Sequence, residues 1–378
     1  MPQSPILPPA MLGILGGGQL GRMFTVAAKT MGYKVTVLDP DQHAPAAAFA
    51  DCHLCAAFDD QDALNELAKC AAITTEFENV NADAMLMLAE TTRVSPSGHS
   101  VAIAQDRFAE KKWINQAGLP TAPFAEIHTL DDCTKQLDTN LFPAILKTAR
   151  LGYDGKGQTK VNTQAELPDA FKQLGHVPCI LEKQLNLFKE VSVVIARLSK
   201  DAFSCFPVAE NQHKNGILDV SIVPARIDAN IQKMAQQMTR KLADELDYQG
   251  VLAVELFVLS DNSLIVNEIA PRPHNSGHYT LDTCATDQFQ QQVRTMCCLP
   301  PGSTELLKPC TMINLLGDSW QNDQNKPNWQ PLMNHPQSYL HLYGKFEARQ
   351  GRKMGHFTVL ADSADQALQT ALHLQASL

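Results

Sequence analysis

The sequence contains no run of about 18 consecutive apolar residues, the length at which a membrane-spanning helix is expected. Its first five residues form neither a basic nor an apolar segment, so we expect no signal peptide. Positive charge is in the minority: 31 Lys and Arg stand against 40 Asp and Glu, which leaves a formal net charge of −9. Nucleic-acid binding favours a clustered positive surface. We therefore expect a cytoplasmic protein with no membrane or nucleic-acid partner.

The cysteines lack the spacing of a structural zinc site. The ten cysteines are scattered, and Cys52 and Cys55 form a lone Cys-x-x-Cys pair. A zinc site would need a second ligand pair at suitable spacing, and none is evident. In a chain of this length with no export signal, reduced thiols are the expectation.

The composition is typical of a globular protein with more than one domain. Hydrophobic residues make up 44% of the 378 residues and charged residues 19%, which argues against a disordered chain. A chain of this length exceeds one ordinary core, so we expect two or three domains.

The first domain, 1–105, has the pattern of an open parallel α/β unit. A strand at 11–15 is followed by a glycine-rich loop, a helix at 22–31 and a second strand at 34–38. A weaker helix–strand pattern follows up to residue 75. The fold class predicted for the whole chain is α/β and α+β.

Two further domains are predicted after residue 105. A helix at 107–116 opens the second domain, 106–190, and the third spans 191–378 and ends in a helix. The segment 321–336, rich in Asn, Gln and Pro, is predicted to be a surface loop. Strands are expected at 144–147, 179–182, 191–196, 251–258, 264–267, 311–315, 339–343 and 355–360.

The glycine-rich loop at 16–21 matches a dinucleotide-binding fingerprint. Gly16-x-Gly18-x-x-Gly21 follows a strand and opens a helix, and Asp39 ends the second strand. A nicotinamide-dependent oxidoreductase is therefore one hypothesis. Physically, the loop indicates only that backbone amides and a helix N-terminus face an anion, and a ribose phosphate would fit as well as a pyrophosphate.

A second glycine-rich loop, 152–158, follows a strand that ends in Lys147. Glycines let a hairpin fold down over phosphates, and Lys156 within the loop adds a mobile positive charge. A plain flexible hairpin is the simpler interpretation of such a loop alone. The lysine on the strand before it favours a nucleotide site.

Two glutamates interrupt apolar strands near residue 260. Glu255 and Glu268 lie on strands joined by a short turn, and a charge on a buried strand is costly unless it is paired or binds a metal. Two such carboxylates can hold one Mg²⁺ ion against ATP phosphates, with Mn²⁺ as an alternative. Asn267 would add a neutral oxygen. Solvent-facing glutamates on an edge strand are the alternative.

The segment 270–278 is predicted to be a rigid loop that presents polar groups. Two prolines restrain the backbone, and Arg272, His274 and Asn275 offer a guanidinium, an imidazole and an amide. This set suits a small oxyanion.

With these motifs in place, the sequence resembles the ATP-grasp superfamily and, within it, the 5-(carboxyamino)imidazole ribonucleotide synthase family of purine biosynthesis. The resemblance spans nearly the whole chain in the family's order. It rests on 13–23 (Gly-Ile-Leu-Gly-Gly-Gly-Gln-Leu-Gly-Arg-Met), 152–158 (Gly-Tyr-Asp-Gly-Lys-Gly-Gln), 267–278 (Asn-Glu-Ile-Ala-Pro-Arg-Pro-His-Asn-Ser-Gly-His) and 351–356 (Gly-Arg-Lys-Met-Gly-His).

The resemblance implies a three-domain ATP-grasp ligase that forms a carbon–nitrogen bond. ATP would phosphorylate bicarbonate to carboxyphosphate, and the exocyclic amine of aminoimidazole ribonucleotide would take up the carboxyl group. The protein would be a homodimer. ADP and phosphate would be released, and the product would pass to a separate enzyme.

The same resemblance implies a set of site residues. ATP would be bound by Arg107, Lys147, Gly152, Tyr153, Asp154, Gly155, Lys156, Gly157, Gln158, Glu182, Lys183, Gln184, Leu185, Glu190, His213, Asn267 and Glu268. Mg²⁺ would be held by Glu255 and Glu268, and bicarbonate by the catalytic residues Arg272, His274 and Asn275. The ribonucleotide would contact Gln19, Leu20, Glu76, Tyr153, Asp154, Lys345, Arg352 and Lys353.

Some alternatives stay open at this point. Asp154 is the candidate for handling the proton of the amine, and the choice between Glu76 and Glu78 as a substrate contact is not fixed by the sequence. Another ATP-grasp ligase, such as a formate-using glycinamide ribonucleotide transformylase or a biotin-type carboxylase, would share the ATP and metal residues. A nucleotide-sensing module without catalysis is disfavoured by the intact carboxylates.

Overall fold

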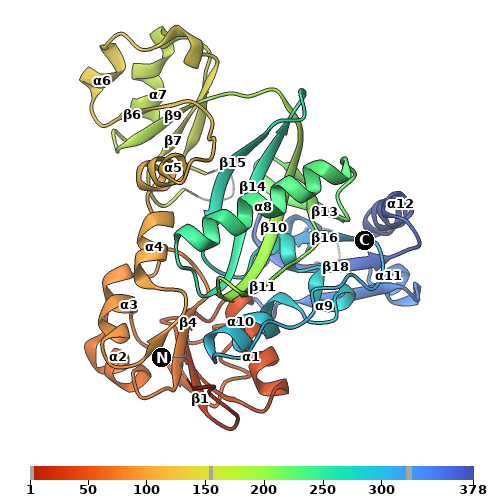
Figure 1. Cartoon of the computed structure of the whole chain (residues 1–378). Helices are drawn as coiled ribbons and strands as arrows, with labels where there is room; N and C mark the ends of the chain where they lie inside the picture. The colour runs from red at the N-terminus through yellow and green to blue at the C-terminus, as the bar shows by residue number, and fades with distance from the viewer. Residues whose placement is uncertain (1–3, 153–155, 321–325) are drawn as a thin grey trace.

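The computed structural model describes residues 4–152, 156–320 and 326–378. Within these ranges the strands form three sheets, which we call the N-terminal, middle and large sheets. Figure 1 shows the middle sheet as a separate lobe at the top, the N-terminal sheet at the bottom and the large sheet beside and between them. No helix of the described residues is long and apolar enough to cross a membrane.

The N-terminal sheet is parallel and has the order β3-β2-β1-β4-β5. Its central strands are almost fully buried because helices cover both faces, as parallel sheets require. Its strands are β1 (Met11–Leu15), β2 (Lys34–Leu38), β3 (Cys52–Leu54), β4 (Ala72–Thr75) and β5 (Arg93–Val94). Its helices are α1 (Gln19–Thr30), α2 (Gln61–Leu67), α3 (Ala82–Ala89) and α4 (Gly98–Ala104).

The middle sheet is antiparallel and has the order β6-β9-β7-β8. Its inner face packs against α6 and α7 around Ile127, Leu146 and Phe171. The strands are β6 (Phe124–Ile127), β7 (Ala144–Thr148), β8 (Gln158–Val161) and β9 (Cys179–Lys183). The helices are α5 (Arg107–Gln116), α6 (Leu130–Thr134) and α7 (Leu167–Gln173), with short 3₁₀ turns η1 (Thr139–Leu141) and η2 (Gln164–Glu166).

The large sheet has the order β15-β14-β10-β12-β13-β16-β18-β17, and β11 pairs with β10. Helix α8 (Ala229–Glu245) lies along one face of it (Figure 1) and packs on β10, β14 and β15. The strands are β10 (Leu187–Ser199), β11 (Ala202–Cys205), β12 (Ala209–Lys214), β13 (Ile217–Val223), β14 (Gly250–Leu259), β15 (Leu264–Ala270), β16 (Cys310–Leu316), β17 (Ser338–Leu342) and β18 (Lys353–Leu360).

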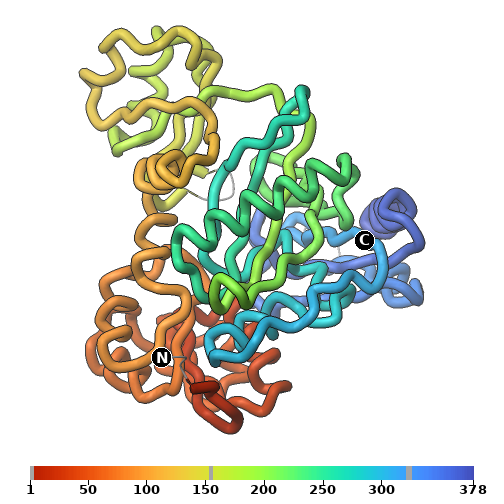
Figure 2. The backbone as a smooth tube through the Cα atoms, in the orientation of Figure 1, coloured from red at the N-terminus to blue at the C-terminus, as the bar shows by residue number. Residues whose placement is uncertain are grey.

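The C-terminal segment continues the large sheet. Strand β13 pairs antiparallel with β16, so the blue tube of Figure 2 lies beside the green strands. This brings the basic stretch around Lys353 near the strands that carry Glu255 and Glu268. The remaining helical elements are η3 (Asn275–Gly277), α9 (Thr280–Thr283), α10 (Gln288–Met296), η4 (Gly317–Trp320), α11 (Gln330–Asn334) and α12 (Ala364–Gln375).

Two local predictions need correction. The first helix begins at Gln19 and not at Arg22, because the glycine-rich loop already enters the helical turn. The predicted loop 321–336 contains the short helix α11, where Pro331 sits in the first turn, a position at which proline is compatible with a helix. Residues 321–325 lie outside the described chain. The predicted domain limits at 105 and 190 stay proposals.

Candidate active site

A cavity of about 630 Å³ lies where the three sheets meet. It is lined by many of the residues singled out from the sequence: Gln19, Leu20, Glu76, Arg107, Lys147, Gly152, Lys156, Gly157, Gln158, Glu190, His213, Glu255, Asn267, Glu268, Arg272, His274, Asn275 and Lys353. The predicted residues Glu182, Lys183, Gln184, Leu185, Lys345 and Arg352 are not among its lining residues. Tyr153, Asp154 and Gly155 lie outside the described residues, so their predicted contacts are not placed.

Glu255 and Glu268 are direct partners across the β14–β15 pair. Side chains that face each other across two strands share one face of the sheet, so both carboxylates enter the cavity. Desolvation and the charge of Glu268 raise the pKa of Glu255 to about 7. Desolvation also acts on Glu268, but Arg107, whose Nη1 is 3.0 Å from Glu268 Oε2, lowers the pKa of that carboxyl.

The oxygens around this pair suit a hard divalent cation. Asn267 precedes Glu268, and its Oδ1 is buried and accepts no hydrogen bond from any described residue. Two carboxylates and an unpaired amide oxygen form the all-oxygen set that Mg²⁺ and Mn²⁺ prefer. The residues therefore fit the predicted metal.

Lysines on α5 and β7 lie next to the carboxylate of Glu182 on β9. Lys147 Nζ lies 2.9 Å from Glu182 Oε2, and the buried Lys111 lies 3.6 Å from the same oxygen. Burial would raise the pKa of Glu182, but Lys147 and Lys111 outweigh it and lower that pKa to about 2. The carboxylate predicted to bind adenine is thus held by two lysines, of which Lys147 lines the cavity.

Lys111 and Glu110 were not identified from the sequence. Lys111 donates to the backbone carbonyl of Asn267 at 2.7 Å, and Glu110 accepts the N–H of Ile269 at 2.7 Å. Together they fix the end of β15 that carries Glu268. A signal was present, because Lys111 falls on the same helix face as the apolar Phe108 and Ile114.

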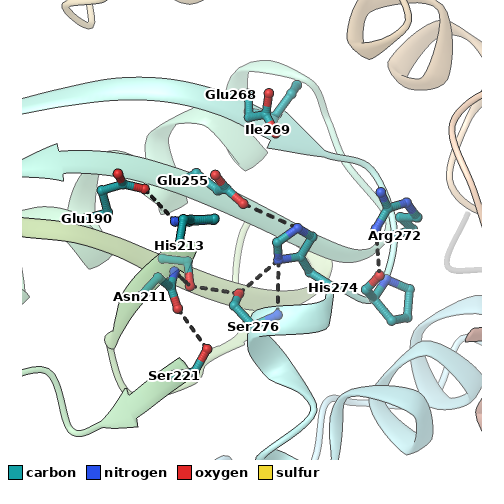
Figure 3. Close-up of polar contacts among 12 residues, drawn as sticks. Glu190, Asn211, His213, Ser221, Glu255, Glu268, Ile269, Arg272, His274 and Ser276 are labelled. Carbon is teal, nitrogen blue, oxygen red and sulfur yellow. Dashed lines mark hydrogen bonds and ion pairs between the residues drawn. The ribbon is translucent and has the colours of Figure 1, made fainter. Parts of the chain in front are cut away.

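His213 and Glu190 form a second charged pair at the cavity wall. They extend from the adjacent strands β12 and β10, with His213 Nδ1 2.7 Å from Glu190 Oε2 (Figure 3). Burial lowers the pKa of His213, but the hydrogen bond and charge of Glu190 outweigh it and raise that pKa. The pair therefore favours the protonated form of this ring at the cavity wall.

The loop after β15 presents the predicted oxyanion groups. Arg272 pairs with Glu78, whose pKa is about 2 because Arg272 outweighs the effect of burial. Burial and the nearby Arg272 lower the pKa of His274 to about 3, so its imidazole is neutral. Both side-chain polar atoms of Asn275 are buried without a hydrogen-bond partner in the described chain. An unpaired amide and a guanidinium at one wall suit a small anion.

The backbone N–H groups of the first glycine-rich loop donate to side-chain carboxyl groups of the protein itself. Glu76 accepts the N–H groups of Gly18 and Gly21, the latter at 2.7 Å, and Asp39 accepts that of Gly17 at 2.7 Å. In this structure these amides are therefore occupied by side chains of the protein, and a role for them toward a ligand phosphate stays a prediction. The same contacts argue against a dinucleotide pyrophosphate. Glu76 and Glu78 both line the cavity but have different partners.

The basic residues after β17 lie at the edge of the site. Lys353 begins β18 and lines the cavity. Lys345 Nζ donates to the carbonyl of Lys353 at 2.8 Å, and Arg352 donates to that of Glu347 at 2.9 Å. These backbone contacts hold Lys345 and Arg352 next to the lining residue.

Comparisons with known proteins agree along the whole chain. Family models match as a ribonucleotide synthetase preATP-grasp domain at 10–105, an ATP-grasp domain at 112–289 and a phosphoribosylaminoimidazole carboxylase C-terminal domain at 310–370. An N5-carboxyaminoimidazole ribonucleotide synthase of Bacillus subtilis (strain 168) is 45% identical over 365 residues, which cover 96% of this chain and 95% of the relative.

Solved structures show the same likeness. The ADP complex of an N5-carboxyaminoimidazole ribonucleotide synthetase aligns with a TM-score of 0.91 and 43% identity, covering 98% of this chain and 97% of that one. The Aspergillus clavatus synthase in complex with ADP and 5-aminoimidazole ribonucleotide aligns with a TM-score of 0.89 and 32% identity, covering 97% and 98%. The resemblance expected from the motifs is thus confirmed, and the chain belongs to the N5-carboxyaminoimidazole ribonucleotide synthase family, the ATP-dependent ligases of purine biosynthesis built on the ATP-grasp fold.

Proposed function

We propose that this protein uses ATP to carboxylate the exocyclic amine of 5-aminoimidazole ribonucleotide with bicarbonate, giving the carboxyamino ribonucleotide, ADP and phosphate. The observation that carries the proposal is one cavity in which Glu255 and Glu268 lie beside the loop of Arg272, His274 and Asn275. A nucleotide-and-metal region therefore adjoins a region suited to a small oxyanion.

The ATP side of the cavity is proposed at Arg107, Lys147 and His213. Their positive charge would stabilise the charge that spreads over the transferred phosphoryl group. Mg²⁺, held by Glu255, Glu268 and the oxygen of Asn267, would supply further neutralisation of the phosphates. The hinge residues Glu182, Lys183, Gln184 and Leu185, together with Glu190, remain the proposed contacts of adenine.

The bicarbonate site is proposed at the loop after β15. Arg272 offers a fork of N–H donors, and the unpaired amide of Asn275 offers another donor to the same wall. A bicarbonate oxygen held there would attack the γ-phosphorus of ATP, with ADP leaving, to form carboxyphosphate. The glycine-rich loop that contains Gly152 and Gln158 borders this space and would exclude water, which would otherwise hydrolyse that intermediate.

The ribonucleotide is proposed to lie between the N-terminal sheet and the C-terminal segment. Gln19, Leu20 and Lys353 line this end of the cavity, and Lys345 and Arg352 lie beside Lys353. Their positive charge suits the 5′-phosphate, whereas the amides of the first glycine-rich loop are already filled by Glu76. Asp154 is still our candidate for taking the proton of the attacking amine, and Tyr153 for a ribonucleotide contact.

Two wider proposals follow from the family. We propose that the protein acts as a homodimer in the cytoplasm, and that the three predicted domains, 1–105, 106–190 and 191–378, carry the ribonucleotide, lid and metal functions. Sedimentation would measure the oligomeric state.

The experiment for the function is ADP release from purified protein with Mg²⁺-ATP. ADP formation that needs bicarbonate and rises with aminoimidazole ribonucleotide would support the proposal, and Glu268→Gln would abolish it. ADP formation only with formate and glycinamide ribonucleotide would overturn the substrate proposal while keeping the fold.

A further inference from the structure

A chain of buried hydrogen bonds runs from the middle of the large sheet to His274. Figure 3 shows it passing from Ser221 to Asn211 and on to Ser276 and His274. Ser221 Oγ lies 2.9 Å from Asn211 Oδ1, and Asn211 Nδ2 lies 2.9 Å from the hydroxyl of Ser192. Ser192 lies 2.8 Å from the hydroxyl of Ser276, which lies 2.8 Å from His274 Nδ1.

The sheet itself sets this path. Asn211 and Ser221 are direct partners on β12 and β13, and Ser192 on β10 is the direct partner of Glu255 on β14. Glu268 follows on β15. A row of polar residues thus crosses the sheet from β13 to β15 and ends at the proposed metal ligands.

These contacts are shielded from bulk water. Ser221 and Ser276 are 0% exposed, Ser192 is 2% exposed and Asn211 is 5% exposed. A buried polar group that loses its partner keeps the full cost of desolvation, so each member holds its neighbour in place.

One backbone group fixes the direction of every bond in the chain. The N–H of Ser276 points at His274 Nδ1 at 3.3 Å, and a backbone N–H can only donate. His274 Nδ1 is therefore an acceptor, so the hydroxyl of Ser276 also donates to it. That hydroxyl must then accept from Ser192.

The same logic continues outward along the chain. Because the hydroxyl hydrogen of Ser192 is used on Ser276, Ser192 accepts from the amide N–H of Asn211. The amide oxygen of Asn211 then accepts from Ser221. Each donor in the path therefore points toward the active site.

We propose that Asn211, Ser192 and Ser276 are positioning residues that hold His274 in the tautomer with its hydrogen on Nε2. That nitrogen faces Glu255 Oε1 at 3.3 Å (Figure 3). A ring fixed in this way presents an N–H donor to the cavity, which is what an oxyanion site requires. The inference rests on the proposed function only in taking this cavity as the active site.

The proposal is tested on the tautomer directly. In protein labelled with ¹⁵N-histidine, long-range ¹H–¹⁵N correlations distinguish protonated from unprotonated ring nitrogens, and loss of signals in His274→Gln assigns the residue. Wild type is expected to show an unprotonated Nδ1 and a protonated Nε2. A protonated Nδ1 in the wild type would overturn the proposal. No substrate is required, so this result stands apart from the activity assay.

Two variants break the chain without touching the cavity. Asn211→Asp replaces the N–H donor by an acceptor of nearly the same shape, which draws the hydroxyl of Ser192 away from Ser276. Ser192→Ala removes the hydroxyl itself. Each is expected to raise the Nδ1-protonated fraction of His274 and to lower kcat about tenfold, the effect of losing one well-aligned hydrogen bond, with KM for ATP unchanged.

A matched control separates positioning from general loss of stability. Thr239→Val also removes a buried hydroxyl, one that bonds only to the carbonyl of Ala235 within α8. It is expected to leave the His274 tautomer and kcat as in wild type. If Asn211→Asp and Ser192→Ala behave like Thr239→Val in both readouts, the proposal is wrong.

Discussion

The carboxylate of Glu76 accepts the backbone N–H of Gly21 at 2.7 Å, 55 residues away in the chain. A second bond from Gly18 completes the pair, and a β-carbon at Gly18 would come within 2.5 Å of Glu76 Oε1. The loop that has the spacing of a dinucleotide site is therefore closed by the carboxyl group of Glu76.

Removal of the Glu76 carboxyl group should expose the N–H groups of the loop. We expect Glu76→Ala to lower the free energy of unfolding by about 1–3 kcal/mol, because two buried N–H groups lose their acceptor. Urea denaturation measures this change. We further expect inorganic phosphate to raise the melting temperature of Glu76→Ala but not of wild type. Equal phosphate effects on both proteins would contradict the claim that Glu76 occupies the N–H groups of this loop.

The pair of Glu182 and Lys147 predicts a specific acid sensitivity. The pKa of Glu182 is about 2, below its ordinary value of 4.5, so its ionised form stabilises the fold above pH 4.5 and this contribution is lost as the pH falls from 4.5 toward 2. We expect the stability difference between wild type and Glu182→Gln to shrink below pH 4.5. Urea unfolding at pH 6, 4 and 3 measures it. A constant difference over that range would show that the charge of Glu182 contributes nothing.

If Glu255 and Glu268 hold the metal, replacing either one should weaken metal binding, and this can be measured without turnover. We expect Glu255→Gln and Glu268→Gln each to weaken Mn²⁺ binding at least about tenfold, because one of the charged ligands is removed. Electron paramagnetic resonance of free Mn²⁺ measures the binding without turnover. The control is Glu66→Gln, an exposed glutamate paired with Lys69. Unchanged Mn²⁺ affinity in both site variants would exclude this pair as the metal site.

Replacement of Arg272 should impair the binding of bicarbonate but not that of ATP. We expect Arg272→Lys to raise KM for bicarbonate at least about tenfold and to leave KM for ATP near wild type, because lysine lacks the planar fork of donors. Steady-state ADP release at varied bicarbonate measures the effect. A rise in KM for ATP of the same size would place Arg272 on the nucleotide instead.

Local sequence patterns predicted those parts of the site that lie on one stretch of chain. The strands that carry Glu255 and Glu268 were expected together because a short turn joins them, and the structure pairs the two residues directly. The first glycine-rich loop was likewise recognised as a set of backbone N–H donors. The contact of Glu76 with this loop could not be predicted, because it depends on the parallel pairing of β1 with β4.

The parts that were missed depend on contacts between distant segments. Lys111 acts through the carbonyl of Asn267, 156 residues away, and Ser192 bonds to Ser276 across 84 residues. Serine and asparagine on strands have no sequence signature, because only the register of β10, β12 and β13 brings them together. Likewise α11 falls in a polar segment where composition favours a loop.

The path through carboxyphosphate is tested most directly by oxygen transfer. If a bicarbonate oxygen attacks the γ-phosphorus of ATP, that oxygen stays on the phosphate when the amine takes the carboxyl group. With ¹⁸O-bicarbonate, ATP and aminoimidazole ribonucleotide, we predict one ¹⁸O atom in each phosphate released, seen by ³¹P NMR, and none with Glu268→Gln because no phosphate is released. Phosphate without ¹⁸O, released at the same rate as the carboxylated ribonucleotide, would contradict the account.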